Sequence, residues 1–290
     1  MSGSDCADKN DELEAGEVGD EEEEALDSRQ AALEEYERRY HCRAIVLDAE
    51  ILTLSAVNLE DILLEIGDCK SLHLFLNTLG GEGGAAIRLV RQMRTRCENL
   101  TVVVPWEAKS AGTLLLLGAD QIVTGPTSDL GPIDPQMWLE HYGRKPAKTI
   151  LGAFERAESA AAADGVLASF HAMVLENRSA FEAQEARESL SHTKLELEQS
   201  LANRPGRSRE DVLQMTDQLQ EILIDVPQVH EASISPDQLN GAGLPMVQLR
   251  PQDQTWIDIW ELWSMYTQIP ENQVYESADL SIRFYLDPSP

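Results

Sequence analysis

The 290-residue chain lacks any stretch of eighteen uninterrupted apolar residues, and its N-terminus has neither the basic nor the apolar segment of a secretory signal. We therefore expect no membrane-spanning helix and no secretion. Cysteine is scarce: Cys6, Cys42, Cys69 and Cys97 show neither metal-ligand spacing nor the density of a disulfide framework. These absences predict reduced thiols and a cytoplasmic protein.

Basic residues are also few, with 23 Lys and Arg against 51 Asp and Glu, which gives a net charge of −28. Phosphates would be repelled by such a chain, so nucleic acid is excluded as a partner. Much of the excess lies in residues 1–40, which carry about −11 and include the run Glu21–Glu24. Such a segment cannot bury enough apolar surface to offset its chain entropy. We expect residues 1–32 to be a disordered acidic tail.

The six histidines show no HExxH or other metal-binding spacing, and the chain has no Walker A loop and no dinucleotide-binding fingerprint. We expect no metal and no cofactor.

Short apolar runs alternate with segments of helical periodicity through the first half of the chain. The runs that predict strands are 44–47, 72–76, 101–104 and 121–124. This alternation predicts a parallel sheet built from βαβ units, within an α/β domain over residues 33–250. The later segment 150–203 lacks proline and is rich in Ala, Glu and Leu, which predicts one or two long helices.

The C-terminal part is rich in tryptophan. Trp256, Trp260 and Trp263 share one face of a predicted helix, a pattern more typical of a core or a subunit interface than of a ligand site. We expect residues 251–290 to be a helical extension.

A serine stands at the start of an apolar helix in Lys109-Ser110-Ala111-Gly112-Thr113, which continues into four leucines. Upstream, Asn77-Thr78-Leu79-Gly80-Gly81 follows a predicted strand, and glycines there let backbone N–H groups approach a bound oxygen. Taken alone, the serine is more typical of a helix N-cap. Together, a hydroxyl nucleophile and a set of amide donors are the two parts that acyl transfer needs.

This order of strand, glycine turn, helix, strand and Ser-Ala-Gly resembles the Clp protease and crotonase superfamily. The closest resemblance is to the serine dehydrogenase proteinases, relatives of the signal peptide peptidases. It extends over residues 72–137, including the Gly125–Gln136 stretch, and resumes weakly over 230–244. The resemblance implies a Clp protease/crotonase-like fold and serine peptidase activity.

The resemblance also implies site residues. Ser110 matches the nucleophile of Clp-type peptidases. Gly80, alone or together with Gly81, matches a glycine that gives one oxyanion N–H, and Ala111 should give the other. These glycines and Ala111 would act through their backbone, not their side chains.

The general base departs from the Clp pattern. Asp134 occupies the place of the family's histidine, and His230 lies where the family has its acidic residue. One interpretation is that the two roles are exchanged, with His230 as base and Asp134 orienting it. The alternative is a lysine base, as in signal peptide peptidases, for which Lys145 or Lys148 lies at a possible distance.

Two classes of function follow. The first is a serine peptidase that hydrolyses extended peptides through an acyl-enzyme on Ser110. The alternative is a catalytically inactive oligomeric scaffold of the same fold. An acyl-CoA enzyme of the crotonase branch is disfavoured because the turn around Ser110 resembles the peptidases. The resemblance implies a homo-oligomer in each case.

Overall fold

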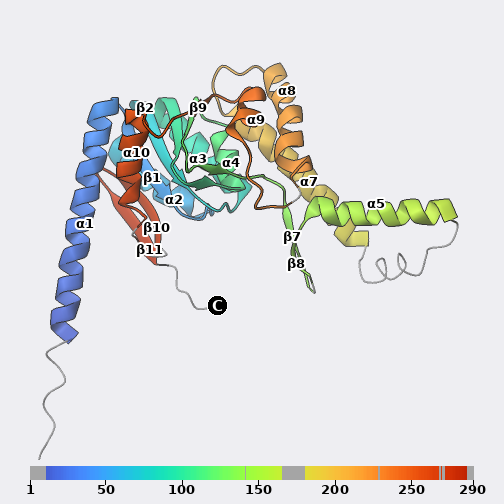
Figure 1. Ribbon diagram of the computed structural model, residues 1–290, viewed down its shortest axis with the longest axis horizontal. Helices are drawn as coiled ribbons and strands as arrows, with labels where there is room; N and C mark the ends of the chain where they lie inside the picture. The colour runs from blue at the N-terminus through green and yellow to red at the C-terminus, as the bar shows by residue number, and fades with distance from the viewer. Residues whose placement is uncertain are drawn as a thin grey trace, which may run out of the picture.

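A computed structural model describes residues 11–140, 142–164, 180–227, 229–267, 269 and 272–285. Its centre is a seven-stranded sheet in the order β11-β10-β1-β2-β3-β5-β9 (Figure 1). The parallel strands are β1 (Arg43–Asp48), β2 (Cys69–Asn77), β3 (Cys97–Val104), β5 (Gln121–Thr124) and β9 (Met246–Gln248). Each of the four predicted apolar runs is one of these strands, so the predicted α/β fold with a parallel sheet is confirmed.

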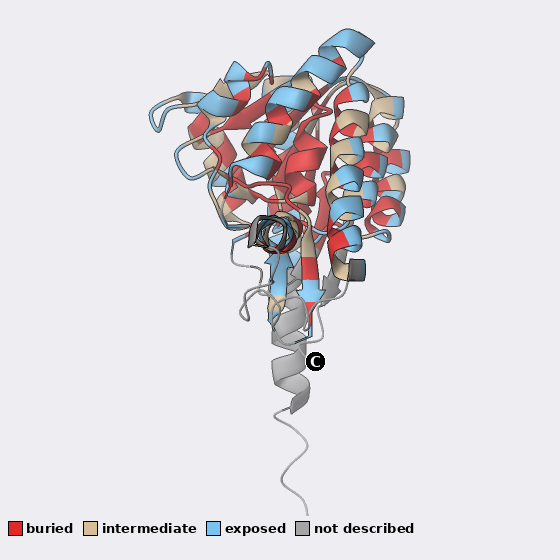
Figure 2. Ribbon diagram, turned by 90° about the vertical axis from the view of Figure 1, so that its right-hand side faces the viewer, coloured by how far each residue is buried: buried red, intermediate tan, exposed pale blue. Residues whose placement is uncertain are grey.

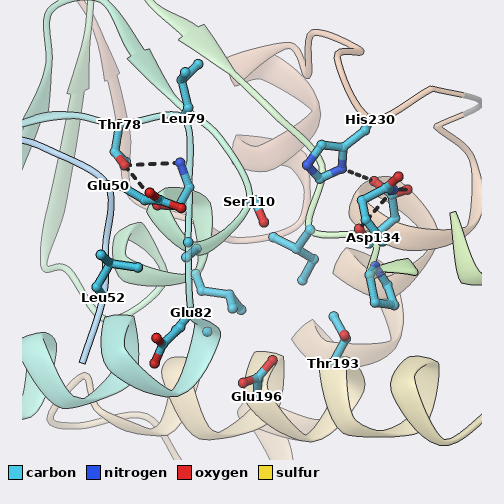
Figure 3. A pocket seen from close by; sticks show the side chains of 18 of the residues that line it. Glu50, Leu52, Thr78, Leu79, Glu82, Ser110, Asp134, Thr193, Glu196 and His230 are labelled. Carbon is cyan, nitrogen blue, oxygen red and sulfur yellow. Dashed lines mark hydrogen bonds and ion pairs between the residues drawn. The ribbon is translucent and has the colours of Figure 1, made fainter. Parts of the chain in front are cut away.

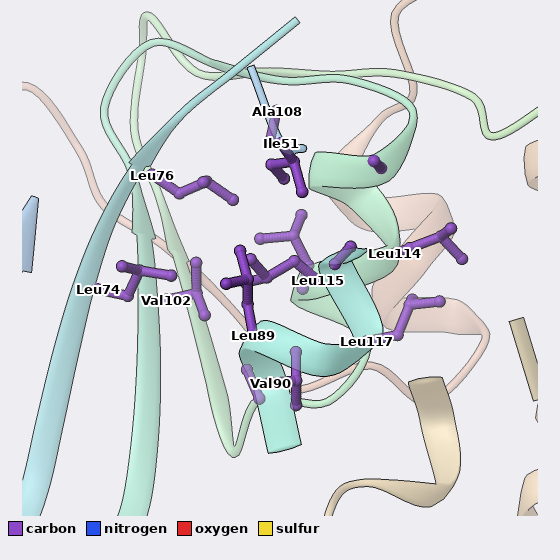
Figure 4. Packing of buried hydrophobic residues seen from close by; sticks show 14 of the residues in the cluster. Ile51, Leu74, Leu76, Leu89, Val90, Val102, Ala108, Leu114, Leu115 and Leu117 are labelled. Atoms are coloured by element: carbon purple, nitrogen blue, oxygen red, sulfur yellow. The ribbon is translucent and has the colours of Figure 1, made fainter. Parts of the chain in front are cut away.

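Helices cover both faces of the sheet. One face packs against the helices α2 (Ser55–Ile66), α3 (Gly83–Arg96) and α4 (Ala111–Leu116). In Figure 4, Leu74 and Val102 of the sheet lie opposite Leu89 of α3 and Leu115 of α4. The other face packs against α1 (Asp11–Tyr40) and α10 (Gln254–Ser264).

The strands are continuous apolar runs because both of their faces are buried. In β1, Ile45 and Leu47 contact the first set of helices, whereas Ala44 and Val46 contact the second. Figure 2 shows the buried residues gathered along the sheet and on the inner sides of the helices.

The helix α1 differs from the disordered tail expected for residues 1–32, of which 1–10 lie outside the described residues. Arg29 is buried, and its Nε lies 3.1 Å from Oε1 of the buried Glu276. The Tyr266 hydroxyl donates to the same carboxylate at 2.8 Å, and Leu33 packs beside them in the core. The acidic composition of the segment therefore did not prevent docking, because the buried charge of Arg29 has a partner in Glu276.

The C-terminal part is only half helical. Trp256 and Trp263 of α10 are buried in the core, in agreement with the core interpretation of the tryptophan stripe. The expected helical extension over 251–290 then differs from the structure, since β10 (Asn272–Ser277) and β11 (Ser281–Tyr285) are strands. β10 pairs antiparallel with β1, so this segment completes one edge of the central sheet. Residues 286–290 lie outside the described residues.

The second half of the chain supplies the long helices that were predicted, α5 (Ala147–Asp164) and α7 (Ala180–Ala202), which lie side by side (Figure 1). The helices that follow are α8 (Arg209–Gln220), the π-helix η1 (Glu221–Asp225) and α9 (Pro236–Gly241). The short strands are β4 (Glu107–Ala108) with β6 (Asp129–Leu130), and the hairpin of β7 (Gln136–Leu139) and β8 (Gly143–Pro146). Among the described residues, no helix is both long and apolar enough to cross a bilayer.

Candidate active site

Ser110 has a strained backbone. Its φ of 49° and ψ of −114° lie where non-glycine residues are uncommon, at a cost of about 1–3 kcal/mol. The hydroxyl makes no capping bond to the helix α4 that it precedes. The structure therefore does not support the N-cap interpretation of Ser110. Strain at a serine between strand and helix is typical of a presented nucleophile.

Bonds to two neighbouring segments, at Thr78 and at residues 129–132, hold this turn in place. The Ser110 N–H donates to the Pro132 carbonyl at 3.1 Å, and the Lys109 N–H donates to the Thr78 carbonyl at 3.1 Å. The Thr113 hydroxyl bonds the Gly131 carbonyl at 2.8 Å, and the Lys109 ammonium pairs with Asp129. The strained conformation of Ser110 is thus fixed from both sides.

The glycine turn lies directly against the serine turn. Gly80 and Gly81 have φ values of 125° and 135°. A Cβ placed on Gly80 would lie 2.8 Å from the Ser110 Cβ, and one on Gly81 would lie 2.0 Å from the Ile51 carbonyl oxygen. Both positions therefore require glycine, for conformation and for space.

The backbone amides of these turns differ in whether they already donate a hydrogen bond within the protein. The Gly80 N–H donates to the Thr78 hydroxyl at 3.1 Å. The N–H groups of Gly81 and Ala111 have no acceptor within the described part of the chain. Of the three predicted oxyanion residues, Gly81 and Ala111 are thus the two with amides available to a ligand.

His230 and Asp134, 96 positions apart in the chain, are in contact. The His230 Nδ1 lies 2.9 Å from the Asp134 Oδ1, and the other Asp134 oxygen accepts a bond from the Gln136 amide at 2.8 Å. Asp134 is only 2% exposed, whereas 27% of the His230 side chain is exposed. In Figure 3 the second ring nitrogen of His230 points to the side of the cavity on which Ser110 lies. No hydrogen bond joins the Ser110 hydroxyl to His230 among the described residues.

Backbone bonds bring the two segments together. The Ile133 N–H donates to the Leu223 carbonyl at 3.0 Å, and the Ile234 N–H donates to the Leu130 carbonyl at 2.7 Å. The segment that carries His230 is therefore tied at both ends to the segment that carries Asp134.

The two candidate lysines lie elsewhere. The Lys148 ammonium bonds the backbone carbonyls of Ile224, Asp225 and Pro227, and burial lowers its pKa. Lys145 is exposed on β8, paired in register with Met137. Neither lysine is among the residues that line the cavity at Ser110.

That cavity has a volume of about 1030 Å³ and contains Ser110, Ala111, Gly80, Gly81, Asp134 and His230 in its lining. It also has an acidic part that includes Asp48, Glu50, Glu82, Glu107 and Glu196. Burial raises the pKa of Asp48 to about 6, and it raises the pKa values of Glu107 and Glu196. Trp138 and Arg144, register partners across the β7–β8 hairpin, line the cavity as well.

These lining residues were not predicted from the sequence. Asp48 and Asn77 end two adjacent parallel strands, and the Asn77 amide donates to the Asp48 carboxylate at 2.7 Å. The carboxyl ends of parallel strands share one edge of a sheet, so their position after apolar runs could have identified them. The hairpin residues Trp138 and Arg144 gave no comparable signal.

No cluster of three or more His, Cys, Asp or Glu in the described ranges could hold a metal ion.

Cys42, Cys69 and Cys97 are free thiols, and burial raises the pKa of Cys42 and of Cys97 to about 12. Such thiols are poor nucleophiles at neutral pH.

Comparisons with known proteins agree with the resemblance seen in the sequence. Residues 56–178 match the family described as ClpP-like SDH-type serine proteinase. This range includes the Gly80 and Ser110 turns and Asp134, and it ends before His230. The resemblance to the serine dehydrogenase proteinases is thereby confirmed over residues 56–178.

Two curated relatives, both from Methanocaldococcus jannaschii, are the uncharacterized proteins MJ0137 and MJ1495. They are 36% identical over 87 residues and 33% identical over 85 residues, which is 30% and 29% of this chain. The chain spans only 29% and 27% of the length of these relatives.

Among solved structures, a mutant of the 1510-N membrane-bound stomatin-specific protease is similar over 80% of this chain and 86% of its own, with a TM-score of 0.44. A mutant of ClpP1 from Listeria monocytogenes is similar over 73% of this chain and 93% of its own, with a TM-score of 0.41. Each is 15% identical to this chain.

Proposed function

Because residues 56–178 match the ClpP-like SDH-type serine proteinases, we propose that this chain is a serine peptidase that hydrolyses peptide bonds through an acyl-enzyme on Ser110. One observation carries the proposal. The buried Asp134 holds His230 at 2.9 Å, in the same cavity as the strained Ser110. A nucleophile, a base and a group that orients the base are the parts of a catalytic triad.

In this proposal the Ser110 oxygen attacks the peptide carbonyl while Nε2 of His230 takes the hydroxyl proton. Asp134 accepts the Nδ1–H of His230, which fixes the tautomer and stabilises the imidazolium that forms. His230 then gives the proton to the leaving amine, and a water molecule hydrolyses the ester by the same route. The Ser110–His230 hydrogen bond would form on substrate binding, since catalytic bonds are often long in free enzymes.

The N–H groups of Gly81 and Ala111 would stabilise the oxyanion. Both lack an acceptor among the described residues, and each such donor is typically worth about 2.7–4 kcal/mol in the transition state. Gly80 has a different role in this proposal. Its missing side chain lets the glycine turn approach Ser110, while its own N–H stays bonded to Thr78.

Extended peptides fit this site best. Leu79 is exposed, lines the cavity and precedes the glycine pair, so the backbone of this segment can pair with a substrate strand. The homo-oligomer that the resemblance implies stays a prediction.

A fluorophosphonate probe tests the proposal, because it reacts with an activated serine and forms a stable adduct. We expect wild-type protein to be labelled at Ser110, Ser110→Ala to be unlabelled, and His230→Gln to react far more slowly while remaining folded. The adduct is located by mass spectrometry of peptides. Labelling of His230→Gln at the wild-type rate would remove the histidine from the role of base.

A second candidate is the non-catalytic oligomeric scaffold. It is favoured by the lack of a hydrogen bond between Ser110 and His230 in the described structure. Absence of labelling in folded wild-type protein, together with full cellular activity of Ser110→Ala, would support the scaffold instead of the peptidase.

A further inference from the structure

We propose that Lys148 is a positioning residue for His230, whose ammonium group holds the backbone of the segment that carries the histidine. The inference rests on the proposed function and concerns the same site. It assigns Lys148 a role other than that of the base.

Within the described residues, the hydrogen bonds of Lys148 all go to backbone oxygens. From the first turn of α5, its Nζ bonds the carbonyls of Ile224 and Pro227, and it lies 3.4 Å from that of Asp225. A lysine ammonium has three donors and no acceptor, so three carbonyls match its full capacity. Pro227 precedes His230 by three residues, and the bond therefore fixes the start of the histidine's loop.

Two of those carbonyls, of Ile224 and Asp225, are at the end of the helix η1, which ends at Asp225. The last carbonyls of a helix have no partner within it, and positive charge near them is stabilising. Lys148 supplies both the hydrogen bonds and the charge at that end.

The first turn of α5 also contacts the segment that carries Asp134. The Ala147 N–H donates to the Pro135 carbonyl at 2.9 Å, directly after Asp134. One turn of α5 thus contacts the aspartate segment through Ala147 and the histidine segment through Lys148. Loss of the ammonium would free the backbone between the ties at Leu223 and Ile234, while the His230 ring keeps its 2.9 Å contact with Asp134.

This geometry speaks against Lys148 as the base. A base must lie within reach of the serine proton, and the lysine does not line the cavity at Ser110. A neutral amine would also give up one of its donors. Burial lowers the pKa of Lys148, but the charges of Asp134 and Asp225 act in the opposite direction and favour the ammonium.

The test compares Lys148→Met and Lys148→Arg in the full chain. Methionine keeps the apolar stem without donors, whereas arginine keeps the charge and the donors but cannot act as a base. Hydrolysis of a fluorogenic peptide library gives kcat and KM, and thermal unfolding checks the fold. The matched control is Arg207→Met, which removes another cation bonded to backbone carbonyls, those of Leu117 and Leu201.

A misplaced base costs on the order of 100-fold in rate. We expect Lys148→Met to lose about that much in kcat with little change in KM, and Lys148→Arg and Arg207→Met to stay close to wild type. If both lysine variants are equally inactive while His230→Gln remains active, the lysine is the base and the inference is wrong. Wild-type kcat in folded Lys148→Met would overturn it too.

A readout independent of activity separates this inference from the proposed function. The Nδ1 proton of His230, bonded to Asp134, gives an NMR signal that His230→Gln identifies by its disappearance. We expect Lys148→Met to shift or broaden this signal, and Lys148→Arg to restore it. An unchanged signal in Lys148→Met refutes the positioning role, whereas a shifted signal in a protein without peptidase activity refutes only the proposed function.

Discussion

Gly80 and Ser110 approach each other so closely that a Cβ on the glycine would lie 2.8 Å from the Cβ of the serine. This contact joins two turns that lie thirty positions apart in the chain. The glycine also has a φ of 125°, which side chains rarely allow.

Gly80→Ala should therefore displace Ser110 as well as strain the turn. We expect loss of fluorophosphonate labelling and a decrease of roughly 1–3 kcal/mol in the free energy of unfolding, the usual cost of a strained residue. Gly84→Ala is the control, since a Cβ there has no heavy atom within 4 Å. Normal labelling of Gly80→Ala would contradict the described packing of the two turns.

Asp134→Asn should keep the fold but reverse the hydrogen-bond preference at His230. The amide can donate to Nδ1, which stabilises the tautomer whose Nε2 carries the proton and cannot accept another. We expect kcat to fall by about 10⁴-fold, as for the matching change in the triad of chymotrypsin-like enzymes. Steady-state kinetics with thermal unfolding as a check measures this, and a change below tenfold would show that Asp134 does not orient the base.

Trp138 should bind substrate without taking part in the chemistry. It is 72% exposed although it lines the cavity, and exposed tryptophans at such sites often provide binding energy. Trp138→Ala should raise KM for peptides with little change in kcat, and alter the free energy of unfolding by less than about 0.5 kcal/mol. Phe181→Ala, also exposed but outside the cavity lining, should leave KM unchanged. Equal KM values for both variants would exclude the hairpin from substrate binding.

His73 should make the stability depend on pH. Burial lowers its pKa to about 4, so between pH 6.5 and 4 the unfolded chain binds a proton that the folded chain does not. The contribution of His73 is therefore complete above pH 6.5 and is lost as the pH falls to 4, by roughly 3 kcal/mol. The raised pKa of Asp48 has the opposite sign, since it favours the folded state as the pH falls.

The difference between wild type and His73→Asn isolates the histidine, because Asp48 is common to both. Asparagine can still bond the Tyr36 hydroxyl, which lies 3.0 Å from the His73 Nδ1. Urea unfolding at pH 7 and pH 4.5 should show a smaller loss of stability for the variant. Parallel losses would mean that His73 is protonated in the folded state.

Local sequence patterns predicted much of the fold. The four apolar runs that became β1, β2, β3 and β5 are buried on both faces, and this burial is what makes them continuous in the sequence. The capping box at Ser208 is local too, since its hydroxyl accepts from the N–H of Asp211, three residues on.

Features that depend on distant partners were not predictable. The docking of α1 depends on Arg29 and Glu276, which are 247 positions apart. The strand β10 depends on its pairing with β1, and its residues alone gave no strand signal that outweighed the helical pattern before them. The bonds from Lys148 to backbone carbonyls cannot be predicted from residue types, because every residue has a carbonyl.

In the candidate site too, the local motifs were predictable and the contacts between distant residues were not. Ser110 and the glycine pair each lie in a contiguous motif, so their roles could be predicted from short stretches of sequence. His230 and Asp134 were paired only through the resemblance, and the structure brings them to 2.9 Å. The acidic lining and the hairpin residues come from separate elements that meet only in the folded chain.

The structure of the protein after reaction with a fluorophosphonate tests the central claim most directly. We predict phosphorus bonded to the Ser110 oxygen, its oxyanion about 2.7–3.1 Å from the N–H groups of Gly81 and Ala111, and His230 beside the leaving-group position. An adduct whose oxygen faces away from both amides, or a serine left unmodified in folded protein, would contradict it.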